Sequence, residues 1–266
     1  NGGFEIDSRI VQEQFNLNNF IGSLFIHAIR INGHDIVKYA LDIIGQNNSK
    51  LSTTHDANAW PADYYAGLPA PDDNEQVTLW IQNSHPMEIP AGSVSFNVMG
   101  SNITSKLDES IPPFATKALD ISSLLPGIKW PKQIEIQAGR HFVRPRYEIS
   151  KNDRNRIAHV NVERTDLVHD TKIKSLGELF GKGFILPMPI LPTNQYNTTI
   201  LPTPMSRNQN NISLGMITLN PEGKKLSHEP LGCFRRDHAL AVDVNKLINN
   251  KLNSFGHLEL LYDFTE

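Results

Sequence analysis

A short stretch between His55 and Tyr65 gathers residue types that often bind ligands. It carries an imidazole, two carboxylates, an amide and three aromatic rings: His55, Asp56, Asn58, Trp60, Asp63, Tyr64 and Tyr65. Aromatic rings stack on sugar faces while carboxylates and amides hold hydroxyl groups, so this composition predicts a carbohydrate site. The same oxygens suit calcium, and the imidazole favours zinc. The alternative is structural: Asp56 and Asn58 form Asx-turns, and Trp60 packs the loop onto the fold.

A second candidate is an alternating run in which His159, Asn161 and Glu163 are separated by valines. In a strand, side chains two residues apart share a face, so these three polar groups are expected to line up. Three such groups on one face are typical of metal sites in sheets, and a divalent metal is the predicted cofactor. A solvated strand face, or a polar contact between domains, is the alternative.

A third candidate is a basic cluster that includes Arg144 and Arg146, echoed later by Arg235 and Arg236. Guanidinium groups grip carboxylate, sulfate or phosphate through paired hydrogen bonds, which predicts an anion site. The alternative is that these arginines pair with acidic neighbours such as Glu148.

Nothing in the sequence assigns a catalytic residue. The chain has no Gly-x-Ser-x-Gly elbow and no complete phosphate loop. Its single cysteine, Cys233, lies between Gly232 and Phe234, which predicts a small buried residue and excludes an intrachain disulfide.

Composition limits the classes of function. The chain has 266 residues, of which 39% are hydrophobic and 20% charged, as expected for a globular protein with a large core. No apolar run is long enough to predict a membrane span. The formal net charge of -3 argues against a protein that binds nucleic acid by neutralising phosphates.

The elements that must position these residues occur twice. Strand Thr78–Ile81, a corner that contains Ala118, Asp120 and Leu124, and strand 134–136 come first. Strand Leu214–Ile217, a corner that contains Ala241, Asp243 and Leu247, and strand 258–260 come later in the same order. A spacing of roughly 120 residues suits whole domains better than solenoid repeats. We therefore predict two domains, residues 1–150 with a long loop at 45–76, and residues 151–266.

Local patterns predict β-structure almost throughout. Alternation from Phe4 to Ser8 and the segments up to Ile44 predict three strands. After each Ala-x-Asp corner one helical turn is expected, capped by Ser122 in the first copy and by Asn245 in the second. Prolines between residues 184 and 204 exclude a central strand there.

The strand order and the repeated corner resemble tandem immunoglobulin-like or fibronectin-like sandwiches of bacterial surface and secreted proteins. The resemblance implies an all-β fold of two Greek-key β-sandwich domains with short helical turns, in an extracytoplasmic location. The second copy ends before its counterpart of residues 140–149, which suggests a truncated domain and a longer parent chain.

These patterns favour a non-catalytic recognition module for carbohydrate or another envelope component, with ligand contacts from the Trp60 loop and from the groove between the domains. Two alternatives stay open. A metal-dependent hydrolase or isomerase would use His55 and Asp56, or His159 and Glu163, and a structural unit would assemble with other domains or as a homo-oligomer through an unpaired strand edge.

Overall fold

The protein is described by a computed structural model. The described residues are 4–22, 24, 40–44, 51–55, 64–138, 145–151, 156–161, 184–203, 210–248 and 252–263. They form several antiparallel sheets with few helices, so the predicted all-β class is confirmed.

Two four-stranded antiparallel sheets form what we call the first sandwich. One sheet contains, in order, β10 (Arg156–Asn161), β9 (Arg146–Lys151), β4 (Glu75–Gln82) and β7 (Thr116–Asp120). The other contains, in order, β3 (Tyr64–Pro69), β8 (Gln133–Gln137), β5 (Ser95–Val98) and β6 (Thr104–Lys106). Alternate apolar residues of both sheets point inward. They form one core, with Leu68, Leu79, Phe96, Ile136 and Tyr147 among its buried members.

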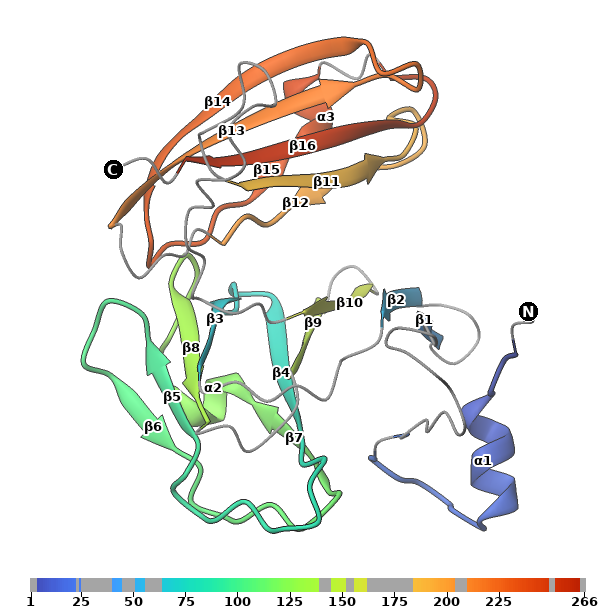
Figure 1. Ribbon diagram of the computed structural model, residues 1–266, viewed down its shortest axis with the longest axis vertical. Helices are drawn as coiled ribbons and strands as arrows, with labels where there is room; N and C mark the ends of the chain where they lie inside the picture. Colours follow the sequence, from blue (N-terminus) through green and yellow to red (C-terminus); the bar gives the residue numbers. More distant parts are fainter. Residues whose placement is uncertain are drawn as a thin grey trace, which may run out of the picture.

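A second sandwich has its own core. Its larger sheet contains, in order, β11 (Phe184–Ile190), β16 (Gly256–Asp263), β13 (Asn211–Leu219) and β14 (Lys225–Arg235). A two-stranded sheet of β12 (Thr199–Ile200) and β15 (Val242–Asp243) covers it. The core between them includes Ile190, Ile200, Met216, Val242 and Leu258. Figure 1 shows β11 to β16 at one end of the molecule and β3 to β8 at the other.

The strand order is the same in both sandwiches. β3-β8-β5-β6 matches β11-β16-β13-β14, and the pair β4-β7 matches the pair β12-β15. In each, a four-residue helix connects the two sheets: α2 (Ile121–Leu124) follows β7 and precedes β8, and α3 (Val244–Leu247) follows β15 and precedes β16. The predicted corner is therefore confirmed as a crossing between sheets.

The predicted helix caps at this corner are wrong. The N-caps are Asp120 and Asp243, whose carboxylates accept hydrogen bonds from the backbone N–H groups of Ser122 and Lys246 at 3.1 and 3.2 Å. Each carboxylate lies at the last strand residue, so it reaches N–H groups that the short helix leaves without partners. Asn245 instead lies inside α3, where it is buried.

One strand of the second copy was matched to the wrong strand of the first. Thr78–Ile81 belongs to β4, but Leu214–Ile217 belongs to β13, whose place in the strand order is that of β5. The error arises because every half-buried strand shows the same period-two apolar pattern. The domain limits at residues 150 and 151 stay a prediction, and β10, which lies beyond them, pairs with β9 in the first sandwich.

Residues 45–76 are not one long loop. They include β2 (Leu51–His55), which pairs with β1 (Ala40–Ile44), and β3, which pairs with β8 across a register shift between Tyr65 and Leu68. Threonines and tyrosines fit a pleated strand well, and this preference outweighs the prolines and asparagines nearby.

The proline-rich strand β11 lies at a sheet edge, as predicted.

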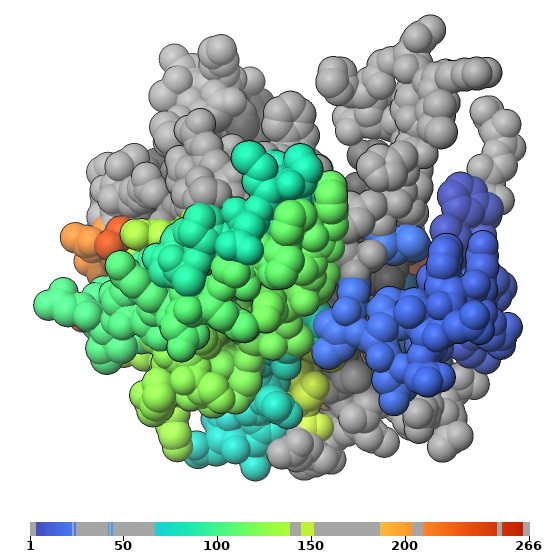
Figure 2. Space-filling view, turned by 90° about the horizontal axis from the view of Figure 1, so that it is seen from below, coloured from blue at the N-terminus to red at the C-terminus, as the bar shows by residue number. Residues whose placement is uncertain are grey.

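The predicted strand from Phe4 to Ser8 is wrong, because residues 4–7 form no strand and Ser8 begins helix α1 (Ser8–Gln14). The Asp7 carboxylate caps it by accepting a hydrogen bond from Arg9 N–H at 2.9 Å. No residue of α1 is buried, and large apolar side chains from residue 4 to residue 24 are exposed. Figure 2 shows this N-terminal segment at the side of the molecule.

No helix in the described ranges has the length and apolarity to cross a membrane.

Candidate functional site

A short bridge joins the two sandwiches next to β8. Residues 131–133 run antiparallel to residues 237–239, with Lys132 opposite His238. Gln133 N–H donates to the Asp237 carbonyl at 3.2 Å, and Ala239 N–H donates to the Pro131 carbonyl at 2.7 Å. Backbone hydrogen bonds therefore fix the two segments in register.

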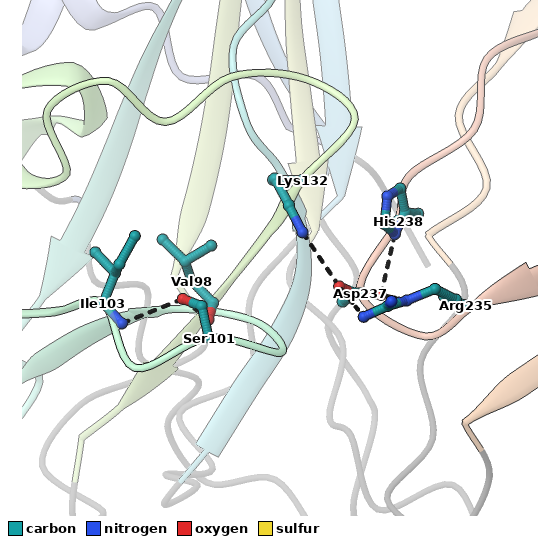
Figure 3. A network of polar contacts seen from close by, with 7 residues as sticks. All are labelled: Val98, Ser101, Ile103, Lys132, Arg235, Asp237 and His238. Carbon is teal, nitrogen blue, oxygen red and sulfur yellow. Dashed lines mark hydrogen bonds and ion pairs between the residues drawn. The ribbon is translucent and has the colours of Figure 1, made fainter.

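The carboxylate of Asp237 is the centre of this bridge (Figure 3). Only 2% of it is exposed, and Arg235 donates to its two oxygens at 2.9 and 3.0 Å. His238 Nδ1 lies 3.0 Å from Oδ1, and Lys132 Nζ donates to Oδ2 at 3.3 Å. Burial alone would raise the pKa of Asp237, but the hydrogen bonds from Arg235, His238 and Lys132 outweigh it and hold this pKa well below its usual range.

The turn between β5 and β6 packs against the same carboxylate. Gly100 has φ +71°, and a Cβ built there would lie 2.8 Å from Asp237 Oδ2. Ser101 Oγ holds the turn, because it accepts from Ile103 N–H and donates to the Val98 carbonyl, both at 3.1 Å (Figure 3). Glycine at residue 100 thus leaves room for the buried charge.

An open pocket of about 130 Å³ lies beside this bridge and draws on both sandwiches. The first sandwich contributes Pro69, Asp72, Glu75, Trp130, Ile149 and Lys151. The second contributes Thr199, Leu201 and Ala241. A partly exposed indole, aliphatic walls and a few charged groups are the usual composition of a binding pocket. We call it the Trp130 pocket.

Backbone hydrogen bonds hold Trp130 in place on both sides. Its N–H donates to the Pro71 carbonyl at 3.0 Å, and the following residue, Pro131, accepts from Ala239 as described above. Ala70 N–H donates to the Lys132 carbonyl at 2.9 Å, which fixes the end of the same segment. The indole is therefore presented by a rigid stretch of chain.

The charged wall of the pocket is an ion pair between facing strands. Glu75 in β4 lies opposite Lys151 in β9, and Lys151 Nζ is 2.7 Å from Glu75 Oε1. The other oxygen of Glu75 accepts from Asp72 N–H at 3.0 Å. Tyr147, whose pKa burial raises well above its usual value, donates its hydroxyl proton to the Pro69 carbonyl. This side of the pocket is thus tied to the first core.

The opposite wall is the short strand β12. Thr199 is exposed, Leu201 is 38% exposed, and Ile200 between them is buried. The buried Asn245 amide fixes the start of β12, because its Oδ1 accepts from Thr198 N–H at 2.9 Å. Its Nδ2 donates to the Tyr196 carbonyl at 2.8 Å.

Most residues of the predicted sites fall outside the described ranges: Asp56, Asn58, Trp60, Asp63, Arg144 and Glu163. His55 ends β2, and Tyr64 begins β3. In the described residues no three His, Cys, Asp or Glu side chains gather as metal ligands. The carbohydrate, metal and anion sites therefore stay predictions.

Several predicted residues can be placed by strand register. His159 and Asn161 lie in β10 opposite Glu148 and Arg146 of β9. Arg146 is a buried residue, 8% exposed. Arg235 forms an ion pair with Asp237. For this arginine the structure therefore agrees with the alternative reading, in which the basic residues pair with acidic neighbours.

The prediction that Cys233 is buried is wrong, because its side chain is exposed. Cys233 lies opposite Ser213 in the β13–β14 pair, and β14 is the outer strand of its sheet. An outer strand whose residues are mostly exposed gives even a small apolar side chain contact with solvent.

Trp130 was not among the predicted site residues. The signal available in the sequence was an aromatic residue followed by Pro131, directly before a predicted strand. Glu75 and Lys151 carried no such signal, because their pairing depends on the register of two strands far apart in sequence.

Comparisons of the chain with protein-family models, with curated proteins and with solved structures find no match.

Proposed function

We propose that this chain is a non-catalytic recognition module and that its ligand binds in the Trp130 pocket. One observation carries the proposal: an indole held by backbone hydrogen bonds opens onto a pocket whose other wall comes from a second sandwich. Tryptophan is enriched among the residues that dominate binding energy, because it offers a large contact area with few rotatable bonds.

The charged groups of the pocket support recognition of a polar ligand that carries an apolar part. Glu75 and Lys151 neutralise each other, and the Asp72 carboxylate adds one formal negative charge to the lining of the pocket. Pro69, Leu201 and Ala241 supply apolar surface next to the indole. An anchor that enters beside Trp130, with polar contacts at the rim, fits this arrangement.

We infer that both sandwiches are Greek-key domains of the immunoglobulin-like or fibronectin-like kind, in a bacterial surface or secreted protein. The repeated strand order and the repeated corner support it. A carbohydrate or another envelope component is the ligand class that the resemblance implies.

Replacing Trp130 with alanine is expected to weaken ligand binding roughly tenfold or more, as loss of an interface hot spot does. The full chain would be screened on a glycan array and against a displayed library of linear peptides, and the best ligand titrated by calorimetry. Phe255→Ala is the matched control, because this aromatic residue is 64% exposed and does not line the pocket.

A second variant is needed because Trp130→Ala could lose binding through misfolding alone. Leu201→Asp changes an exposed residue of the opposite wall and is expected to weaken binding comparably. Thermal unfolding would confirm that each variant is folded. Unchanged affinity in both variants, or no ligand in either screen, would show that the proposal is wrong.

A further inference from the structure

Strand β12 uses only one of its two edges for pairing within the described residues. Val244 N–H donates to the Thr198 carbonyl, and Leu240 N–H donates to the Pro202 carbonyl, both at 3.0 Å. Ile200, midway between these two acceptors, lies opposite Val242. Residues 198, 200 and 202 therefore direct their backbone groups toward β15.

Alternate residues of an antiparallel strand direct their N–H and C=O groups to opposite edges. The backbone groups of Thr199 and Leu201 must therefore point away from β15. No hydrogen bond from the described residues reaches them, and both residues are exposed. Two donors and two acceptors thus lie at the spacing of a strand along an edge that no described residue pairs with, which we call the open edge.

The first sandwich shows what occupies the equivalent edge. By strand order β4 is the counterpart of β12, as β7 is of β15. β4 pairs with β7 on one side and antiparallel with β9 on the other. β9 places Tyr147 and Ile149, two residues apart, in the first core. In the second sandwich, the described residues supply no strand in the position of β9.

We propose that β12 binds an extended polypeptide segment of a partner protein, which adds as an antiparallel strand and places one apolar side chain in the Trp130 pocket. This inference rests on the proposed function and names its ligand class. Thr199 and Leu201 belong to both the open edge and the pocket wall, so one segment can use both.

The size of the pocket favours a single side chain. At about 130 Å³ it is close to the engineered cavity of about 150 Å³ that binds benzene, so it accommodates one leucine-sized or phenyl-sized group. Pockets for whole small-molecule ligands are larger, at roughly 300 Å³ or more. A strand backbone also matches the two-residue repeat of the open edge, as in other cases of strand addition.

The test distinguishes the contribution of the Thr199 backbone N–H to binding from the contribution of its side chain. Linear peptides would be selected from a displayed library on the full chain and titrated against Thr199→Pro and Thr199→Ala. Proline removes only the outward N–H and keeps the bonds of residues 198, 200 and 202 to β15, as edge positions tolerate. Both variants lose the side chain that lines the pocket, but only proline also loses the backbone N–H, so Thr199→Pro is expected to bind roughly tenfold more weakly than Thr199→Ala, a difference of about 1.4 kcal/mol.

A second measurement leaves the protein unchanged. The best peptide would be N-methylated at one residue at a time and titrated against wild-type protein. Strand addition predicts that methylation weakens binding at every second residue, because only alternate N–H groups donate to the edge. Equal sensitivity at neighbouring residues, or equal affinity of Thr199→Pro and Thr199→Ala, would overturn the inference.

The outcomes also separate this inference from the proposed function. Glycan binding that depends on Trp130, with no peptide selected, would overturn strand addition and keep the recognition module. Peptide binding that is lost in Thr199→Pro but unaffected by Trp130→Ala and Leu201→Asp would support the strand edge and contradict the pocket.

Discussion

Replacing Asp237 with alanine is expected to lower the free energy of unfolding by about 3 kcal/mol, as removal of one partner from a buried ion pair does. The carboxylate is 2% exposed and accepts hydrogen bonds from Arg235 and Lys132. These two side chains are 64% and 41% exposed and regain water in the variant. The cost therefore lies at the lower end of the range for buried pairs. Urea unfolding of the variant and the wild type would measure it.

Asp73→Ala is the matched control, because Asp73 also pairs with a lysine, Lys129, but on the surface. An exposed pair contributes little, so this variant is expected to unfold nearly as the wild type does. Equal destabilisation by the two substitutions would contradict the role given to burial at the bridge.

The Asp237 carboxylate should also make the free energy of unfolding depend on pH in the acid range. The pKa of Asp237 is lowered on folding, so below the ordinary value of about 3.9 the unfolded chain binds more protons than the folded one. The contribution of Asp237 is fully present above that pH and is lost as the pH falls toward its lower folded pKa. Asp237→Ala should therefore lose less stability than the wild type between about pH 5 and pH 2.

Replacing Gly256 with alanine is expected to destabilise the second sandwich by about 3 kcal/mol, the upper part of the range for overpacking. A Cβ at residue 256 would lie 2.4 Å from the backbone carbonyl oxygen of Leu219 and 2.9 Å from Leu252 Cδ2. Gly256 begins β16, which pairs with β11 on one side and β13 on the other. Backbone on both sides prevents the strand from shifting, so the clash must strain the sheet. Thermal and urea unfolding would report the loss.

Gly215→Ala is the control in the same sheet. The nearest atom to a Cβ there is Leu261 Cδ1 at 3.6 Å, an ordinary contact. Alanine in a strand loses less backbone entropy on folding than glycine, so this change should be neutral or slightly stabilising. A loss at Gly215 equal to that at Gly256 would contradict the packing described around β16.

Much of the fold could be predicted from the sequence, because its signals are local. Local patterns identified strands such as β4 and β13, and the Ala-x-Asp corner identified both crossings between sheets. The same local patterns could not show which strand of one copy matches which strand of the other. Helix α1 was missed because the alternating residues Phe4 to Ser8 run directly up to its first turn, so its capping residue Asp7 was assigned to a strand.

The candidate site was harder to predict from the sequence, because it depends on contacts between residues that are far apart in the chain. Lys132 and Asp237 meet only when the two sandwiches are placed side by side, and Glu75 meets Lys151 only in one strand register. The open edge of β12 follows from hydrogen-bond alternation over a strand of two residues. No composition or spacing rule points to such an edge.

Backbone amide exchange, measured by NMR on the full chain with and without a selected peptide, tests the central claim most directly. If β12 and the Trp130 pocket form the binding site, the amides of Thr199 and Leu201 will exchange more slowly in the complex, and the indole N–H resonance of Trp130 will shift. Protection confined to another strand edge, such as that of β14, with Thr199, Leu201 and Trp130 unchanged, would contradict the claim.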